Sequence, residues 1–158
     1  MKIIDNFLPE EEFKSIQSFL RGGEFRWFYS EGAVEPDDGQ FHMTHMFFQP
    51  QVGSNSEHLP MWNNFMNKLE AKECIRIKAN LTLKTPTIET APFHIDYFDG
   101  KTAVFYINTN NGYTEFESGV RVNSVANRVC IFDSHLKHRG TTHSEGSNQR
   151  IVVNFNYA

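Results

Sequence analysis

Two long segments of the sequence alternate between apolar and polar side chains, the pattern of a β-strand that buries one face. Across residues 74–84 the apolar positions are Ile75, Ile77, Ala79, Leu81 and Leu83. Across residues 150–157 they are Ile151, Val153, Phe155 and Tyr157. The opposite faces are mostly polar and include Asn80 and Arg150. We expect the apolar faces to pack on helices and the polar faces to line a cavity or, for residues 74–84, to contact solvent.

Helical patterns are confined to the first half of the chain. One amphipathic segment starts near Pro9 and ends at Gly22, and a second starts near Leu59 with apolar side chains at positions 61, 65 and 69. Strand-like segments bounded by turn residues occupy much of the remainder, at residues 1–7, 25–29, 41–49, 102–108, 113–116 and 129–132. These patterns predict a mainly β fold, a cupin-like jelly roll (double-stranded β-helix) with the two N-terminal helices packed on its outer face.

Composition sets outer bounds on the class of protein. A chain of 158 residues fits one domain, which we expect to span residues 1–158. The net charge is −4, with basic and acidic residues intermixed, so we expect no binding to nucleic acid or to an anionic membrane. Cys74 and Cys130 lack the spacing of a zinc ribbon or a disulfide framework. With no signal peptide or membrane span evident, we expect a soluble cytoplasmic protein of unspecified oligomeric state.

A candidate metal-binding motif is the tripeptide His94-Ile95-Asp96. Residues two apart in a strand point to the same face, so one imidazole and one carboxylate would lie side by side. A histidine from a distant strand would complete a two-histidine, one-carboxylate set, which leaves positions of an octahedral metal open and is typical of non-haem Fe(II) oxygenases. His135, His138 and His143 all precede the last strand and compete for this role.

Arg150 opens the last strand on its polar face. A lone arginine at a strand start is usually a surface charge, but an arginine that points inward requires a carboxylate partner. Its rigid guanidinium fork suits bidentate binding of a carboxylate, such as that of a dicarboxylic co-substrate.

Taken in order, the motifs resemble the iron(II)- and 2-oxoglutarate-dependent dioxygenases. The elements of this resemblance are His94-Ile95-Asp96, then His138-Arg139-Gly140, then Arg150 before a terminal apolar strand. Between them, residues 105–108 (Phe-Tyr-Ile-Asn) and 111–116 (Asn-Gly-Tyr-Thr-Glu-Phe) are similar to the tyrosine strand and the Gly-Gly-x-Thr-x-Phe stretch of the prolyl-4-hydroxylase-like branch. The resemblance covers roughly residues 75–157. A single His-x-Asp motif occurs by chance, whereas this ordered set is specific.

The resemblance implies a set of roles. His94, Asp96 and His138 would bind Fe(II), since His138 begins a His-x-Gly pattern and lies twelve positions before Arg150. Arg150 would bind the distal carboxylate of 2-oxoglutarate, and O2 would be the oxidant. No catalytic residue beyond the metal ligands is implied. The expected reaction is hydroxylation of a C–H bond in a peptidyl or small-molecule substrate, with release of succinate and CO2.

Two further residues are candidate contacts of 2-oxoglutarate. By the same resemblance, the strand at residues 74–84 commonly donates a hydrogen bond to the co-substrate, which makes Asn80 a candidate. Tyr106 either points its hydroxyl at the co-substrate or packs in the core. The polar segments at residues 30–40 and 50–57 form either a lid over the pocket or ordinary surface loops. His42 and His45, three apart in a strand, receive no metal role.

Other classes of function fit part of the pattern. A non-enzymatic metal-binding jelly roll, acting as a sensor or binding module, would keep the three metal ligands without a co-substrate pocket. A structural jelly roll in which His94 and Asp96 are only hydrogen-bonded would bind no metal tightly. Nucleic-acid repair by the same type of oxygenase is disfavoured by the acidic balance.

Overall fold

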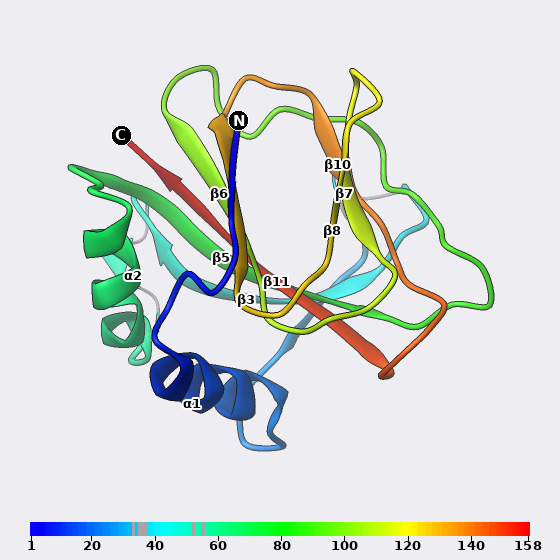
Figure 1. Cartoon of the computed structure of the whole chain (residues 1–158), viewed down its shortest axis with the longest axis horizontal. Coiled ribbons are helices and arrows are strands. Elements are labelled where there is room, and N and C mark those ends of the chain that lie inside the picture. Colours follow the sequence, from blue (N-terminus) through cyan, green and yellow to red (C-terminus); the bar gives the residue numbers. More distant parts are fainter. Residues whose placement is uncertain (33, 35–37, 52, 55) are drawn as a thin grey trace.

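The computed structural model describes residues 1–32, 34, 38–51, 53–54 and 56–158. Within these residues the strands form two antiparallel sheets (Figure 1). The larger sheet has the order β1 (Lys2–Ile4), β9 (Arg128–Asp133), β6 (Lys101–Tyr106), β11 (Gln149–Tyr157), β5 (Cys74–Leu83), β3 (His42–Gln49) and β2 (Phe28–Ser30), with β4 (Gly53–Ser54) paired to β3. The smaller sheet has the order β10 (His138–Gly140), β7 (Tyr113–Phe116) and β8 (Arg121–Asn123). The predicted mainly β, jelly-roll class is confirmed.

The helices follow the two amphipathic patterns. Helix α1 (Glu10–Arg21) starts directly after Pro9 and has three glutamates in its first turn. It is capped by Gly22, whose N–H donates to the Phe19 carbonyl at 3.1 Å. Acidic side chains in a first turn complement the helix dipole. The second pattern forms a 3-10 turn, η1 (Leu59–Trp62), that continues as α2 (Asn63–Lys68). The expected second helix is therefore present in two short pieces.

The helices contact one face of the larger sheet, as the arrangement in Figure 1 shows. The Phe13 ring of α1 lies 5.9 Å from the Phe105 ring of β6. Phe65 of α2 stacks on Phe155 of β11 with ring centroids 4.1 Å apart, and Trp62 meets Phe155 edge-on at 5.1 Å. The apolar positions of β5 and β11 supply this core, which leaves the polar positions of both strands on the opposite face.

That opposite face, here called the cavity face, is ordered in rows across β5, β11 and β6. Arg76, Asn156 and Thr102 form one row. Lys78, Asn154 and Val104 form the next. A second apolar cluster lies between the sheets and consists of Val104, Tyr106, Phe116, Val122, Cys130, Phe132 and Val152. The register therefore places polar groups from distant strands side by side on the cavity face, next to this apolar cluster.

The structure describes only part of the two polar segments at residues 30–40 and 50–57. Residues 33 and 35–37 of the first polar segment, and 52 and 55 of the second, lie outside the described residues. Val34, Gly39 and Gln40 line a cavity between the sheets, and the Gln40 amide donates to the Thr90 carbonyl at 2.7 Å. Part of residues 30–40 thus borders this cavity.

Candidate active site

The extended segment that carries His94 and Asp96 pairs directly with the chain around His138. The backbone N–H of each histidine donates to the carbonyl of the other, both at 3.0 Å. The Asp96 N–H donates to the Ser134 carbonyl at 3.2 Å. These bonds align two segments that are distant in sequence, and they bring the His138 side chain to the two-residue pair.

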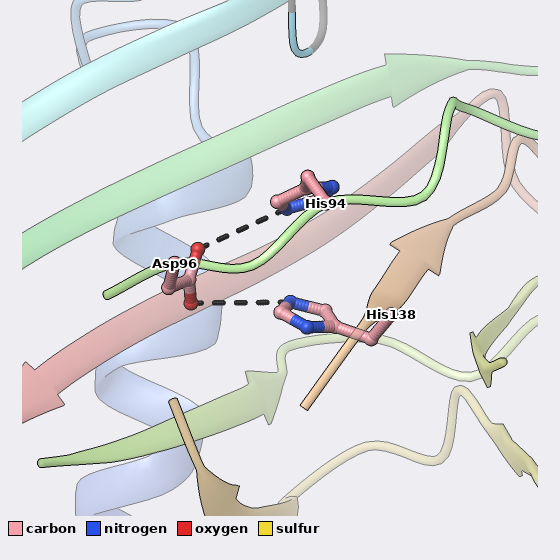
Figure 2. A group of neighbouring side chains, drawn as sticks. All are labelled: His94, Asp96 and His138. Carbon is pink, nitrogen blue, oxygen red and sulfur yellow. Dashed lines mark ion pairs between the residues drawn. The ribbon is translucent and has the colours of Figure 1, made fainter. Parts of the chain in front are cut away.

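The three side chains face one another (Figure 2). One donor atom from each of His94, Asp96 and His138 lies within 4.8 Å of the others. His94 Nε2 is 3.8 Å from Asp96 Oδ1, and His138 Nε2 is 3.9 Å from Asp96 Oδ2. These distances exceed those of hydrogen bonds. Two imidazoles and one carboxylate converging at this spacing form a donor set suited to a first-row transition metal.

Backbone carbonyls orient both imidazoles. His138 Nδ1 lies 2.8 Å from the Leu136 carbonyl oxygen, and His94 Nδ1 lies 3.3 Å from that of Pro92. Because a carbonyl only accepts, Nδ1 carries the proton and Nε2 keeps a lone pair toward Asp96. Burial lowers the pKa of His138 despite the nearby Asp96 charge, which keeps this imidazole in the neutral form that binds metals.

Asp96 is held by the first row of the cavity face. Arg76 Nη2 lies 3.1 Å from its Oδ1, and Thr102 and Asn156 each donate to its Oδ2 at 3.0 Å. Burial opposes ionisation of this carboxyl, but the charge of Arg76 and the Asn156 hydrogen bond act against it, and the pKa of Asp96 is lowered. The carboxylate is thus ionised and fixed before any metal binds.

The metal-ligand cluster opens into a cavity of about 390 Å³ that Arg150 also lines. Arg150 is only 4% exposed, and its Nε donates to Ser124 Oγ at 2.9 Å. Its Nη2 has no hydrogen-bond partner, and no acidic residue in the described part of the chain forms an ion pair with it. Burial lowers its pKa to about 10. An uncompensated buried cation is costly, so this site favours an anionic ligand.

Gly112 makes room for the Arg150 side chain. A Cβ at this position would lie 2.6 Å from Arg150 Cδ, 2.7 Å from Arg150 Nε and 2.8 Å from the Thr142 carbonyl oxygen. Any side chain at position 112 would therefore displace the guanidinium or the backbone. This contact gives a physical reason for the glycine in the Gly-Tyr-Thr-Glu-Phe stretch.

The other two candidate contacts occupy different places. Asn80 lines the cavity. Tyr106 is fully buried, and its hydroxyl donates to Thr114 Oγ1 at 2.8 Å. Among the described residues, Thr114 lines the cavity and Tyr106 does not. Tyr106 is therefore hydrogen-bonded to a residue of the cavity wall and does not itself reach the cavity. Binding of 2-oxoglutarate by Asn80 and Tyr106 stays a prediction.

The remaining histidines lie outside the cluster. His135 is exposed, and His143 is buried with Nε2 2.6 Å from the Ser147 carbonyl oxygen. His45 points to the helix side of the sheet, where Ser56 Oγ lies 2.9 Å from its Nε2. His42 lines the cavity, with Nδ1 unpartnered. Among the described residues, His94, Asp96 and His138 thus form the only group of three or more histidine, cysteine or acidic side chains that could hold a metal.

The sequence patterns did not assign the groups that support these residues. Arg76, Asn156 and Thr102 around Asp96, and Ser124 at Arg150, have no motif of their own. Their only signal was the polar side of the alternating strands, which supplies Arg76 and Asn156. Which polar side chain meets which carboxylate depends on the register between distant strands.

Sequence comparison finds no matching family model and no matching curated protein. The fold is similar to a prolyl-4-hydroxylase of Pseudomonas putida, with a TM-score of 0.68 and 16% identity over 99% of this chain and 92% of that one. It is similar to an oxidoreductase of the 2OG-Fe(II) oxygenase family from Burkholderia pseudomallei, with a TM-score of 0.70 and 12% identity over 99% and 84%. It is also similar to a prolyl hydroxylase of Trichoplax adhaerens in complex with a hypoxia inducible factor oxygen degradation domain peptide fragment. The TM-score is 0.69, and the identity is 14% over 99% of this chain and 82% of that one.

The chain therefore has the fold of the 2-oxoglutarate- and iron-dependent oxygenases, as the sequence resemblance predicted. At these identities the likeness concerns the fold, and function must be argued from the site. No helix within the described residues is long and apolar enough to cross a membrane.

Proposed function

We propose that residues 1–158 form one Fe(II)- and 2-oxoglutarate-dependent dioxygenase domain that hydroxylates a C–H bond of its substrate. One observation carries the proposal: a two-histidine, one-carboxylate cluster and a buried arginine, which has no acidic partner among the described residues, open into the same cavity. The first feature alone fits many metal proteins. The second requires an anion within reach of the metal site, as a chelating dicarboxylate would supply.

His94, Asp96 and His138 would hold the metal. Both imidazoles offer Nε2, and Asp96 is already ionised and anchored, so three protein ligands leave the other positions of an octahedral ion open. Bound iron with 2-oxoglutarate and O2 supplies oxidation of a substrate C–H bond, with succinate and CO2 as co-products. The protein contributes orientation of the ligands and exclusion of water.

Arg150 would hold the distal carboxylate of 2-oxoglutarate. Its Nη2 is free to donate, while Ser124 fixes the Nε side of the guanidinium and Gly112 gives it room. Asn80 on the same cavity and Thr114, supported by Tyr106, would donate further hydrogen bonds to the co-substrate.

A peptidyl residue is the favoured substrate, and a small molecule is the alternative. Two of the proteins with the same fold are described as prolyl hydroxylases, and one of these was solved with a peptide fragment. The cavity reaches the surface beside Phe41, which is 54% exposed and would offer an apolar contact to a docked chain.

The proposal is tested by anaerobic titration of the apo-protein with Fe(II) and then 2-oxoglutarate, followed by the weak visible charge-transfer absorption of an iron-chelated 2-oxo acid. We expect this band in the wild type and its loss in His138→Ala. His135→Ala, which removes an exposed histidine three positions away, is the matched control and should keep the band. Arg150→Ala should need at least about tenfold more 2-oxoglutarate, because it removes a charge-assisted hydrogen bond.

Two results would contradict the proposal. Iron binding without the band would indicate a non-enzymatic metal-binding jelly roll, a sensor or binding module. Absence of tight iron binding would indicate a structural jelly roll in which the three side chains are only packed together.

A further inference from the structure

Lys78 is a further cation that lines the cavity. It occupies the cavity face of β5, in register with Asn154 of β11. Its side chain is half-buried, and its ammonium forms no hydrogen bond or ion pair with any of the described residues. Burial and the neighbouring Arg76 charge lower the pKa of Lys78, although Asp96 acts in the opposite direction. The ammonium is therefore partly desolvated and has no direct hydrogen-bond or ion-pair partner among the described residues.

Asn154 beside it has an unpartnered oxygen within the described part of the chain. Its Oδ1 is buried without a hydrogen-bond partner, although it faces a polar cavity. An ammonium has three donors and a side-chain amide has two. If Lys78 donates one hydrogen bond to the Asn154 oxygen, two ammonium donors and the amide N–H groups stay available for one anion.

The charge of the cavity supports the same conclusion. Among the described residues, the charged side chains that line it are Arg76, Lys78, Glu89, Asp96 and Arg150. Glu89 is exposed, and Asp96 is paired with Arg76. The charges of Fe(II) and doubly ionised 2-oxoglutarate cancel, so a loaded site keeps an excess of positive charge in a chain whose net charge is −4. A site of one sign attracts a ligand of the other.

We propose that Lys78 and Asn154 bind an acidic group, a carboxylate or phosphate, of the substrate. The inference rests on the proposed function and narrows its substrate class to anionic small molecules or acidic peptides. The pair lies one row from Arg76, Asn156 and Thr102, which hold Asp96, and a row step of two residues spans about 7 Å. The acidic group would consequently bind close to the metal and would aim the neighbouring carbon at it.

The test uses three small probes that share a methyl group: acetate, methylphosphonate and neutral acetamide. Binding to Zn(II)-loaded protein with saturating 2-oxoglutarate is followed by ligand-observed NMR. We expect saturable binding of at least one anion and none of acetamide. Lys78→Met should weaken anion binding by at least about tenfold, because it removes a charged donor. Lys84→Met is the matched control: Lys84 is exposed and directly follows β5, so this variant should bind the anion as the wild type does.

A second variant, Lys78→Gln, should lose binding to a similar degree and guards against misfolding of the methionine variant. Preference for acetate assigns a carboxylate, and preference for methylphosphonate assigns a phosphate. The inference is overturned if neither anion binds, if acetamide binds equally, or if both Lys78 variants bind as the wild type does. The iron charge-transfer band tests the proposed function independently: its absence together with Lys78-dependent anion binding would reject the oxygenase and keep the anion site.

Discussion

At the scale of single residues, the behaviour of Arg150 is set by two small neighbours. Ser124 satisfies its Nε, and Gly112 leaves space beside its Cδ and Nε. The guanidinium fork is rigid, so its value in binding a carboxylate depends on its position to a fraction of an ångström. Gly112 is therefore as important to the anion site as a residue that donates a hydrogen bond.

Gly112→Ala should weaken 2-oxoglutarate binding by at least about tenfold, because the new Cβ would lie 2.6 Å from Arg150 Cδ. Iron binding should be unchanged, since the three atoms nearest to the new Cβ belong to Arg150 and Thr142 and not to the metal ligands. The measurement is the 2-oxoglutarate concentration at half-maximal charge-transfer absorption. Gly23→Ala is the control, because a Cβ at that position meets nothing within 4 Å. Equal affinity in both variants would show that Arg150 does not position the co-substrate.

Residue-level prediction from sequence succeeded where chemistry is local. The two-residue spacing of His94 and Asp96 determines that both side chains point the same way in an extended segment. His138, in contrast, could be selected among three histidines only by family resemblance, through its pattern with Gly140 and its interval before Arg150. The backbone pairing that brings it to His94 joins segments far apart in the chain, and no local propensity encodes such a pairing.

At the scale of elements, β5 and β11 each serve two environments at once. Their apolar faces belong to the core that also contains side chains of α1, η1 and α2, and their polar faces line the cavity. The helices thus support the strands from the side opposite to the site. Packing on the helix side sets stability, whereas polar groups on the cavity side set ligand binding, so substitutions on the two faces should have separable effects.

Phe65→Ala should destabilise the fold by about 3 to 5 kcal/mol, the usual cost of removing a buried phenylalanine. Phe65 is fully buried, with its ring 4.1 Å from Phe155 and 4.7 Å from Phe105. The free energy of unfolding in urea measures the effect. Phe98→Ala, which removes a ring that is 82% exposed, should change it by less than about 0.5 kcal/mol. A loss in Phe65→Ala no larger than in Phe98→Ala would mean that α2 does not support the sheet.

The strands with alternating apolar and polar residues could be predicted from the sequence, whereas the bounds of strands in aromatic segments were harder to predict. Residues 25–29 have strand-like composition, but the strand there is Phe28–Ser30. Phe25 instead packs in the core, 5.9 Å from the Phe47 ring. Aromatic side chains favour both strands and core packing, so composition alone does not separate the two outcomes.

At the scale of the whole molecule, burial of histidines couples stability to pH. The pKa values of His42, His45, His138 and His143 are all lowered, in each case chiefly by burial. The unfolded chain takes up these protons near the ordinary histidine pKa of 6.5, whereas the folded chain resists protonation until lower pH. Their contribution to stability is therefore present above pH 6.5 and is lost as the pH falls below it.

We expect the free energy of unfolding of the apo-protein to fall when the pH is lowered from about 7.5 to about 5.5. The carboxyls with lowered pKa, such as Asp96 and Asp5, start from ordinary values of 3.8 and lose their contribution only at lower pH. The decline in this window is consequently due to the histidines. Urea unfolding at several pH values measures it, and His45→Gln should make the slope shallower. His135→Gln removes an exposed histidine and should leave the slope unchanged. A stability that stays constant or rises on acidification would contradict the assignment of neutral buried imidazoles.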